Sequence, residues 1–387
     1  MNTIKRHVVV ETLKVFVATT AVAMFLMTIG GGAKEGISQG LPPQIVLQTL
    51  PYIVPEMLRF VIPGCLLFAI CSVFGRMASS NEVVALKSLG INPLTVVWPV
   101  LILAYALSVF TFWMYDVCAV WARPNLRELV SQSIDDIAYS FLRSNRSFSS
   151  REVSIVVKGV AQDRLLKPVV TIASGGEAVP VTLIAQQARL HSDAETGTLR
   201  IECQNGQLDM AGKGSLSFPG RFVHDIALRG FDEIQEDCLP PAALGMRALP
   251  KQVASEKKEI ARLEGLLKAS RQSEDATVQG EQYTQQLDYR RSRLFRLQAE
   301  PHRRLSNGLG CLCFAMVGVP VSLRRRSADT MSIFFLCFLP ILLVYYPLLM
   351  TGENLARQGV YPQLTVWLAD GVLLVVGGLL MMHMTRR

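Results

Sequence analysis

Six long apolar runs constrain the fold of this chain more than any other feature of its sequence. A helix needs about 20 mostly apolar residues to cross about 30 Å of hydrocarbon. Half of the 387 residues are hydrophobic and only 18% are charged. The sequence therefore predicts six membrane-spanning helices. They are expected at about 10–32, 52–74, 93–115, 306–323, 331–350 and 363–384.

The charged residues concentrate between the third and fourth runs, which indicates a soluble insert in a membrane protein. We expect an α-helical membrane protein with six transmembrane helices, an inserted β jelly-roll-like domain and a helical hairpin. The expected parts are 1–115 with three spans and a cytosolic helix at about 79–90, 116–250 with the β-domain, 251–304 with the hairpin leading to the membrane, and 305–387 with three spans.

Short strands are predicted within the insert, because β-branched and apolar residues alternate or cluster between turn residues. The Asn205-Gly206 pair predicts a hairpin turn. Strands at this spacing are typical of a sandwich or jelly roll. They are expected at 152–160, 167–174, 181–192, 198–210 and 221–228.

Heptad-like spacing follows the strands and predicts the helical hairpin. Val253, Ile260 and Leu267 are seven residues apart, as are Leu287 and Leu294, and the polar stretch 271–280 lies between the two series. Two interpretations remain open for this hairpin, an arm that docks a partner and a solvated lever that leads into the fourth span.

Orientation follows from the Lys and Arg residues of the short loops, which favour the cytosolic side. With six spans, one side carries only Lys34 and Arg357 as basic residues of its short loops. We therefore expect both termini in the cytosol and residues 116–304 outside. The cytosolic set is Lys5, Arg6, Arg76, Lys87, Arg324, Arg325, Arg326, Arg386 and Arg387.

The stretch 79–90 predicts an amphipathic helix of about three turns on the cytosolic side. Ser79 lies three residues before Glu82, which is the spacing of a capping box, and Gly90 marks the helix end. The apolar residues of this helix are Val83, Val84, Leu86 and Leu89. The helix could present a face to a partner, or it could be a solvated loop in which Glu82 only caps its own helix.

Charged residues within or beside the spans indicate pairing more readily than ion transport. Glu56 and Arg59 are three residues apart, so they can pair on one helix face. Asp370 lies inside the sixth run, where a hydrogen-bonded acid is simpler to propose than a proton path. Cys203 and Cys238 could form a disulfide if the insert lies outside the cytosol.

Enzymatic motifs are missing from the sequence. The five histidines have no zinc-ligand spacing, no G-x-S-x-G is present, and the glycine-rich run 29–36 lacks the GK[ST] of a phosphate loop. The net charge of +8 comes without a basic stripe interleaved with aromatic residues, so we expect no nucleic-acid partner. We expect no catalytic residue, metal or cofactor, and energy must enter from another protein.

Four segments of the chain resemble the LptF/LptG (YjgP/YjgQ) permease family of the lipopolysaccharide export ABC transporter. Residues 41–100 are similar to the second span and coupling loop of the family, 183–208 to its outer β-domain, and 299–327 and 352–380 to the fourth and sixth spans. The helical insert at 251–298 and Asp370 depart from the family pattern.

The resemblance implies a multi-pass protein of the bacterial inner membrane that extracts lipopolysaccharide. The implied partners are a second LptF/LptG-type permease subunit, an LptB-type cytosolic ATPase dimer and periplasmic LptC/LptA-like jelly-roll proteins. The cytosolic helix would dock into a groove of the ATPase through Glu82, Val83, Leu86, Leu89 and Gly90. Lys34 and Arg59 are the candidate lipid-binding residues, although Lys34 could also be a plain interfacial anchor.

A rival hypothesis makes the protein a membrane scaffold or signalling subunit without transport activity. Its outer domain would bind a protein and its cytosolic helix would report that binding. The motifs do not distinguish an LptF-like from an LptG-like subunit.

Overall fold

The computed structural model describes most of the chain and divides it into two compact units. One consists of Met1–Met27, Val54–Ala122 and Pro240–Arg387, and the other of Thr28–Ile53 and Arg123–Leu239. The first unit is helical and the second contains a β-sheet. The described residues are 2–33, 43–132, 139, 142–143, 146–149, 153–161, 164–172, 181–193, 198–210, 214–227, 239–270, 276–324, 329–359 and 361–386.

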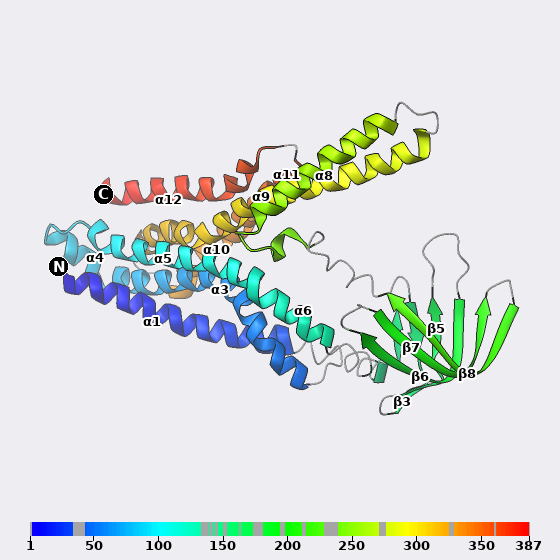
Figure 1. Ribbon diagram of the computed structural model, residues 1–387. Coiled ribbons are helices and arrows are strands. Elements are labelled where there is room, and N and C mark those ends of the chain that lie inside the picture. The colour runs from blue at the N-terminus through cyan, green and yellow to red at the C-terminus, as the bar shows by residue number, and fades with distance from the viewer. Residues whose placement is uncertain are drawn as a thin grey trace. The chain divides into compact units, whose positions relative to one another are not determined.

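Six helical segments of the described chain are long and apolar enough to cross a membrane, which confirms the predicted number of spans. The spans form one bundle, with both termini at the same end (Figure 1). The fifth span consists of two α-helices joined by the π-helical turn Ile341–Tyr345. The helices are α1 (Asn2–Met27), α3 (Pro43–Ser79), α5 (Leu94–Val117), α9 (Ala276–Arg324), α10 (Thr330–Pro340), α11 (Tyr346–Gln358) and α12 (Leu368–Arg386).

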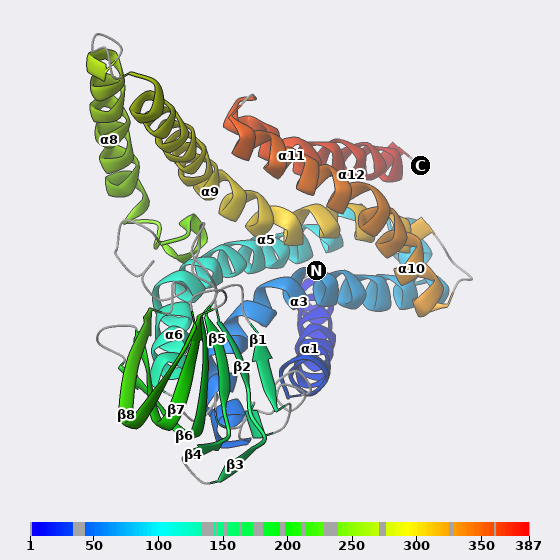
Figure 2. The ribbon, with the colours of Figure 1, turned by 90° about the vertical axis from the view of Figure 1, so that its right-hand side faces the viewer.

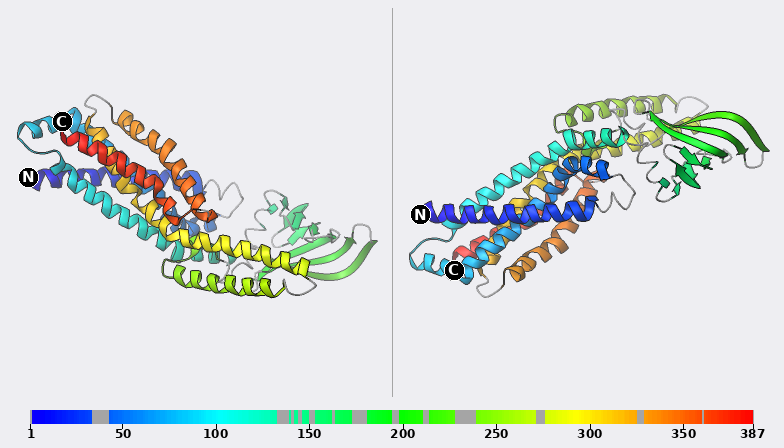
Figure 3. Two further views of the ribbon diagram at one scale, coloured as in Figure 1. Left: turned by 90° about the horizontal axis from the view of Figure 1, so that it is seen from above. Right: turned by 90° about the horizontal axis from the view of Figure 1, so that it is seen from below.

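Helix α9 is the central element of the bundle. It packs against α5, α11 and α12 and continues beyond them to pack against α8 (Leu249–Ser270). The fourth span and the second arm of the hairpin are therefore one helix of 49 residues (Figure 3). Gly308 allows the close approach of α5, because a Cβ at this position would lie 3.0 Å from the Cβ of Phe112.

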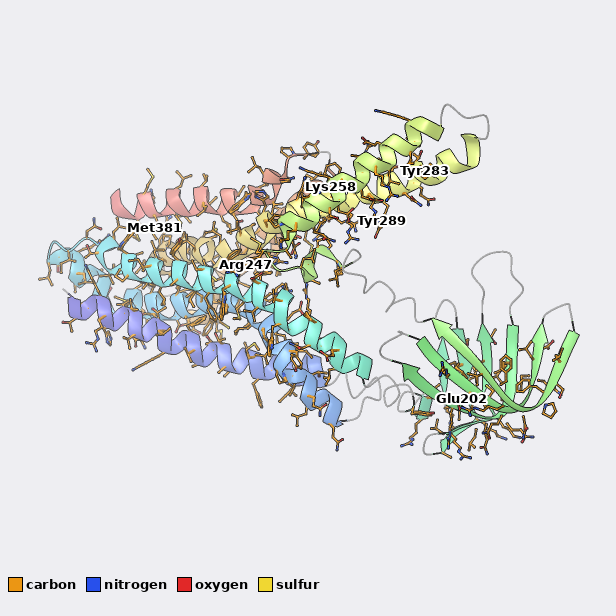
Figure 4. The ribbon with its side chains drawn as sticks, in the orientation of Figure 1. Glu202, Arg247, Lys258, Tyr283, Tyr289 and Met381 are labelled. Atoms are coloured by element: carbon orange, nitrogen blue, oxygen red, sulfur yellow. The ribbon has the colours of Figure 1, made fainter. Side chains whose placement is uncertain are left out.

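The main apolar core of the bundle lies between α3, α5 and α9. Ile62, Leu66 and Ile70 of α3 are almost fully buried in it, as is Val100 of α5. Met381 of α12, labelled in Figure 4, belongs to the same cluster. Burial of these side chains from several spans holds the bundle together through non-directional contacts.

The hairpin of α8 and α9 agrees with the heptad-like prediction. Ile260, Leu263 and Leu287 are buried between the two arms. Glu256 is also buried, and its Oε1 lies 3.1 Å from Nη1 of Arg290 and 3.0 Å from Nε of Arg293. A buried carboxylate needs such partners, so this cluster fixes the register of the two arms. Figure 4 labels Lys258 on α8, and Tyr283 and Tyr289 on the α9 arm.

The second unit contains an eight-stranded antiparallel sheet, in agreement with the predicted β-domain (Figure 2). Strands β1, β2, β5, β6, β4 and β3 are neighbours in this order, and β7 pairs with β6 and β8. One face buries Leu165, Leu183, Ile201 and Cys203. The strands are β1 (Ser147–Ser149), β2 (Val153–Val156), β3 (Gly159–Ala161), β4 (Arg164–Leu166), β5 (Val169–Ile172), β6 (Val181–Asp193), β7 (Thr198–Met210) and β8 (Gly214–Ala227).

The turn predicted at Asn205-Gly206 is wrong, because both residues lie inside β7. The register shifts between Gln204 and Gly206, which marks a β-bulge, and Asn205 has a φ of 50°. A Cβ at Gly206 would lie 2.4 Å from the carbonyl oxygen of Ile184, so the bulge requires glycine. The Asn-Gly pair suits this bulge as it suits a turn, because asparagine tolerates a positive φ and glycine has no Cβ to collide with a neighbouring backbone.

Cys203 lies on the buried face of the sheet, and its burial raises the pKa of the thiol to about 12. Its proposed partner Cys238 lies outside the described residues, so the disulfide stays a prediction. Glu202, labelled in Figure 4, points away on β7 and pairs with Arg221 of β8.

Candidate functional site

A short helix, α4 (Glu82–Ser88), lies at the end of the bundle that carries both termini (Figure 1). It follows α3 directly. Leu86 is only 9% exposed and belongs to the main apolar core, and Val83 and Ile91 pack against that core. The inner side of α4 is therefore fixed to the bundle by apolar contacts.

The capping box predicted for Ser79 and Glu82 is wrong. Ser79 is the last residue of α3, and its hydroxyl donates to the carbonyl of Arg76. Asn81 is the N-cap of α4, with a φ of 58° and no side-chain capping bond. Only Ser80 and Asn81 separate the two helices, and the Ser79 hydroxyl bonds to the last turn of α3 instead of capping α4. The helix that follows has seven residues and is shorter than the predicted three turns.

Gly90 ends α4 as predicted. Its φ is 74°, its N–H donates to the carbonyl of Lys87 at 2.9 Å, and the N–H of Ile91 donates to the carbonyl of Leu86 at 3.0 Å. This is the hydrogen-bond pattern of a Schellman motif, which favours glycine at the left-handed position. The contact of Ile91 with the core that holds Leu86 completes the motif.

The apolar residues of α4 do not share one face, which corrects the simple amphipathic prediction. Val83 and Leu86 face the bundle, whereas Val84 and Leu89 are exposed, and Leu89 is 74% exposed. Glu82 is also exposed, and its carboxylate accepts a hydrogen bond from Ser80 Oγ at 3.0 Å. The predicted site residues thus divide into an inner pair that anchors the helix and an outer surface open to a partner.

Arg59 lies on α3 nearer the opposite end of the bundle, and its predicted pairing with Glu56 is confirmed. Its Nη2 donates to Glu56 Oε1 at 2.7 Å. The guanidinium carbon lies 4.7 Å from the ring centre of Phe60 and 4.6 Å from that of Tyr115. Two aromatic faces and one carboxylate stabilise this cation. Lys34, the other candidate lipid ligand, lies outside the described residues.

A cavity of about 230 Å³ adjoins Arg59 between α3, α5, α9 and α11. Arg303 of α9 and Asn307 also line it, together with Glu353 of α11. Arg303 forms a bidentate pair with Glu300, at 2.8 and 2.9 Å. The cavity therefore combines two guanidinium groups with aromatic walls from Phe60, Tyr115, Phe314, Tyr345 and Tyr346.

Arg304 joins three segments that are distant in sequence, and the sequence analysis did not identify it. It is 1% exposed, its Nε donates to Glu300 Oε1 at 3.0 Å, and its Nη2 donates to the carbonyl of Leu244 at 2.6 Å. Asp116 at the end of α5 accepts from Nη1 of Arg304 at 3.5 Å and from the N–H of Met246 at 2.8 Å. The spacing of Glu300 with Arg303 and Arg304 was the available signal, because residues three and four apart share a helix face.

Asp370 is fully buried on α12 and confirms the interpretation of a hydrogen-bonded acid inside the bundle. The hydroxyl of Tyr345 donates to its Oδ1 at 3.1 Å, and the hydroxyl of Ser306 donates to its Oδ2. These contacts join the fourth, fifth and sixth spans at one polar point.

The described residues contain no group of three or more His, Cys, Asp or Glu side chains that could hold a metal ion. The candidate surfaces are the outer side of α4 and the cavity beside Arg59, whose two guanidinium groups are each paired with a glutamate.

Comparison with known proteins identifies the family. The family model described as lipopolysaccharide export system permease LptF/LptG matches residues 6–383, which includes the six spans, α4 and the β-sheet. No curated protein sequence matches the chain. The extent of the family match decides the assignment, and the chain belongs to the LptF/LptG family of lipopolysaccharide export permeases.

Proposed function

We propose that this permease subunit is driven through α4 by a separate LptB-type cytosolic ATPase dimer. The observation that carries the proposal is the division of α4 into two sides. Leu86 anchors the helix in the core, while Glu82 and Leu89 remain exposed at the tip of the bundle. A force applied to the outer surface would act on the packed spans through the inner one.

Helix α3 runs without interruption from α4 toward the far part of the bundle. Ser79 at its end and Arg59 are 20 residues apart on one helix, a separation of about 30 Å at 1.5 Å per residue. A tilt of α3 at the α4 end therefore displaces Arg59 and the wall of its cavity. This coupling would let ATP hydrolysis change a ligand site on the other side of the membrane.

The basic residues of the bundle support an orientation in the inner membrane. Lys5, Arg6, Arg76, Lys87 and Arg324 belong to the end of the bundle where α4 lies, and such clusters favour the cytosol. We place both termini and α4 in the cytosol, and the β-sheet and the hairpin in the periplasm. This arrangement puts α4 within reach of a cytosolic ATPase.

The substrate would be held between this subunit and a second LptF/LptG-type subunit, and then passed to periplasmic LptC/LptA-like proteins. Lipopolysaccharide carries phosphates and acyl chains, so a cavity that combines two guanidinium groups with aromatic walls suits it. Arg59 and Lys34 are the proposed lipid ligands. Lys34→Glu should reduce lipopolysaccharide retained on purification, and unchanged retention would leave Lys34 as an interfacial anchor.

The coupling proposal is tested by ATPase assays on the reconstituted transporter with Glu82→Lys. Reversal of an exposed charge at the docking surface should leave the spans folded and abolish both stimulated ATP hydrolysis and lipid extraction. The matched control is Asp329→Lys, which makes the same change of charge at an exposed residue before α10 that makes no side-chain capping bond. Retained extraction in Glu82→Lys, or an equal loss in Asp329→Lys, would contradict the assignment.

A further inference from the structure

A second cavity, of about 510 Å³, lies at the α4 end of the bundle. One wall is α4, and the others come from the last turns of α9 and α12 and from α10. Its size lies within the range of about 300–1,000 Å³ that is usual for ligand pockets. The cavity is separate from the one beside Arg59, and its lining does not include Glu82 or Leu89, which carry the proposed ATPase contact.

Cationic and apolar side chains both line this cavity, and its part nearer the middle of the bundle is apolar. Arg324 is the last residue of α9, and Val321 lies three residues before it. On α12, Leu380 likewise lies three residues before His383. Three residues of helix correspond to about 4.5 Å, or nearly one turn. Val321 and Leu380 therefore lie about one turn deeper than Arg324 and His383, while Leu323 and Met384 lie at the level of these polar residues.

The basic side chains that line this cavity lack acidic partners in the described part of the chain. Lys87 of α4, Arg324 and His383 are all exposed, and none of the ion pairs between described residues includes them. No described residue of the cavity lining is acidic. Three donors from three elements, Lys87, Arg324 and His383, thus line one cavity.

We propose that this cavity binds an anionic glycerophospholipid. The phosphate is held by Lys87, Arg324 and His383, and an acyl chain extends along Leu336 and Leu380. Basic pockets between the ends of transmembrane helices attract anionic headgroups, because the cations are near the membrane surface and the apolar wall accepts hydrocarbon. The two halves of the cavity match the two halves of such a lipid.

The bound lipid would also support α4. Val83, Val84 and Lys87 form the α4 wall of the cavity, so a lipid there bridges α4 to the ends of α9 and α12. This role does not depend on the direction of transport or on the identity of the exported substrate.

The test is native mass spectrometry of the full chain titrated with dioleoylphosphatidylglycerol or dioleoylphosphatidylethanolamine in detergent micelles. Phosphatidylglycerol should bind more tightly. Arg324→Ala should weaken that binding about fivefold, because one cation near the surface contributes about 1 kcal/mol. Arg6→Ala is the control, since it removes an exposed cation of α1 that does not line the cavity. Equal binding of the two lipids, or an equal effect of the two substitutions, would overturn the proposal.

A second pair of variants tests the acyl chain. Leu380→Trp fills the cavity and should reduce binding of phosphatidylglycerol, whereas Leu379→Trp at the neighbouring, 61% exposed position should not. Glycerol phosphate and inorganic phosphate serve as soluble competitors. Weak competition by both supports a lipid, while displacement of the lipid by either at equal concentration would show a simple phosphate site and overturn the proposal.

Discussion

The two ends of the helical bundle are stabilised by different interactions. At the end away from the termini, Arg304 and Glu300 are buried and bind each other, and Arg304 also binds the backbone of the segment that leads into α8. At the α4 end, α4 is held by Leu86, and Arg76 pairs with the partly buried Glu11 through a side chain that is 58% exposed. Directional bonds fix the first end, and apolar contacts hold the second.

This difference is consistent with the proposal that movement enters the bundle at α4. A buried ion pair tolerates little displacement, because separating its partners leaves a charge unpaired in a poorly solvated site. Apolar contacts lack direction and allow small shifts between packed helices. Movement imposed by a partner can therefore enter at α4, while Arg304 keeps the chain that returns from the β-sheet attached to the bundle.

The largest predicted effect is that of Arg304→Ala. Removal of one partner from a buried pair costs about 3–5 kcal/mol, so the thermal midpoint of the purified protein should fall by several degrees. Arg262→Ala is the control, because Arg262 forms an exposed pair at 3.7 Å with Glu259, and such pairs contribute about 0–1 kcal/mol. If both variants melted at the same temperature, the buried network would not be what fixes this end.

A smaller effect is predicted for Leu86→Ala. Loss of this side chain from the core costs about 2–3 kcal/mol and should loosen α4 while the spans stay folded. Amide hydrogen exchange should become faster within residues 82–88. Leu89→Ala is the matched control, since its side chain is 74% exposed and its removal should change stability by less than about 0.5 kcal/mol. Slow exchange of α4 in Leu86→Ala would show that other contacts anchor it.

Hydropathy was sufficient to predict the spans, because a helix in hydrocarbon must be apolar over a fixed length. It could not give the full length of α9. The apolar run predicted a span of 306–323, whereas the helix begins at Ala276, because its polar first half is stabilised by packing against α8. The heptad-like spacing predicted the two arms of the hairpin, but it could not show that the second arm and the fourth span are one continuous helix.

Local patterns in the sequence succeeded where one backbone requirement decides the outcome. Gly90 ends α4 because its positive φ demands glycine, and Glu56 pairs with Arg59 because the helix brings them together. Patterns failed where tertiary context chooses between uses of the same residues. Ser79 closes α3 instead of capping α4, and Asn205 forms a bulge instead of a turn.

The residues around Arg304 show the limit of sequence reasoning for the site. Helical spacing connects Glu300 with Arg304, but Asp116 and the carbonyl of Leu244 are distant in sequence. Only the fold brings them together. For the same reason, the division of α4 into an anchored and an exposed side could be recognised only from the burial of each residue in the structure.

The most direct test of the central claim is photo-cross-linking from position 89 in cells. A photoreactive phenylalanine derivative in place of the exposed Leu89 should form an adduct with the cytosolic ATPase, whereas the same probe in place of Leu379, exposed on α12, should not. An ATPase adduct from position 89 alone would support entry of force through α4. Adducts from position 89 with periplasmic proteins only, and none with the ATPase, would contradict both the orientation of the bundle and the role of α4.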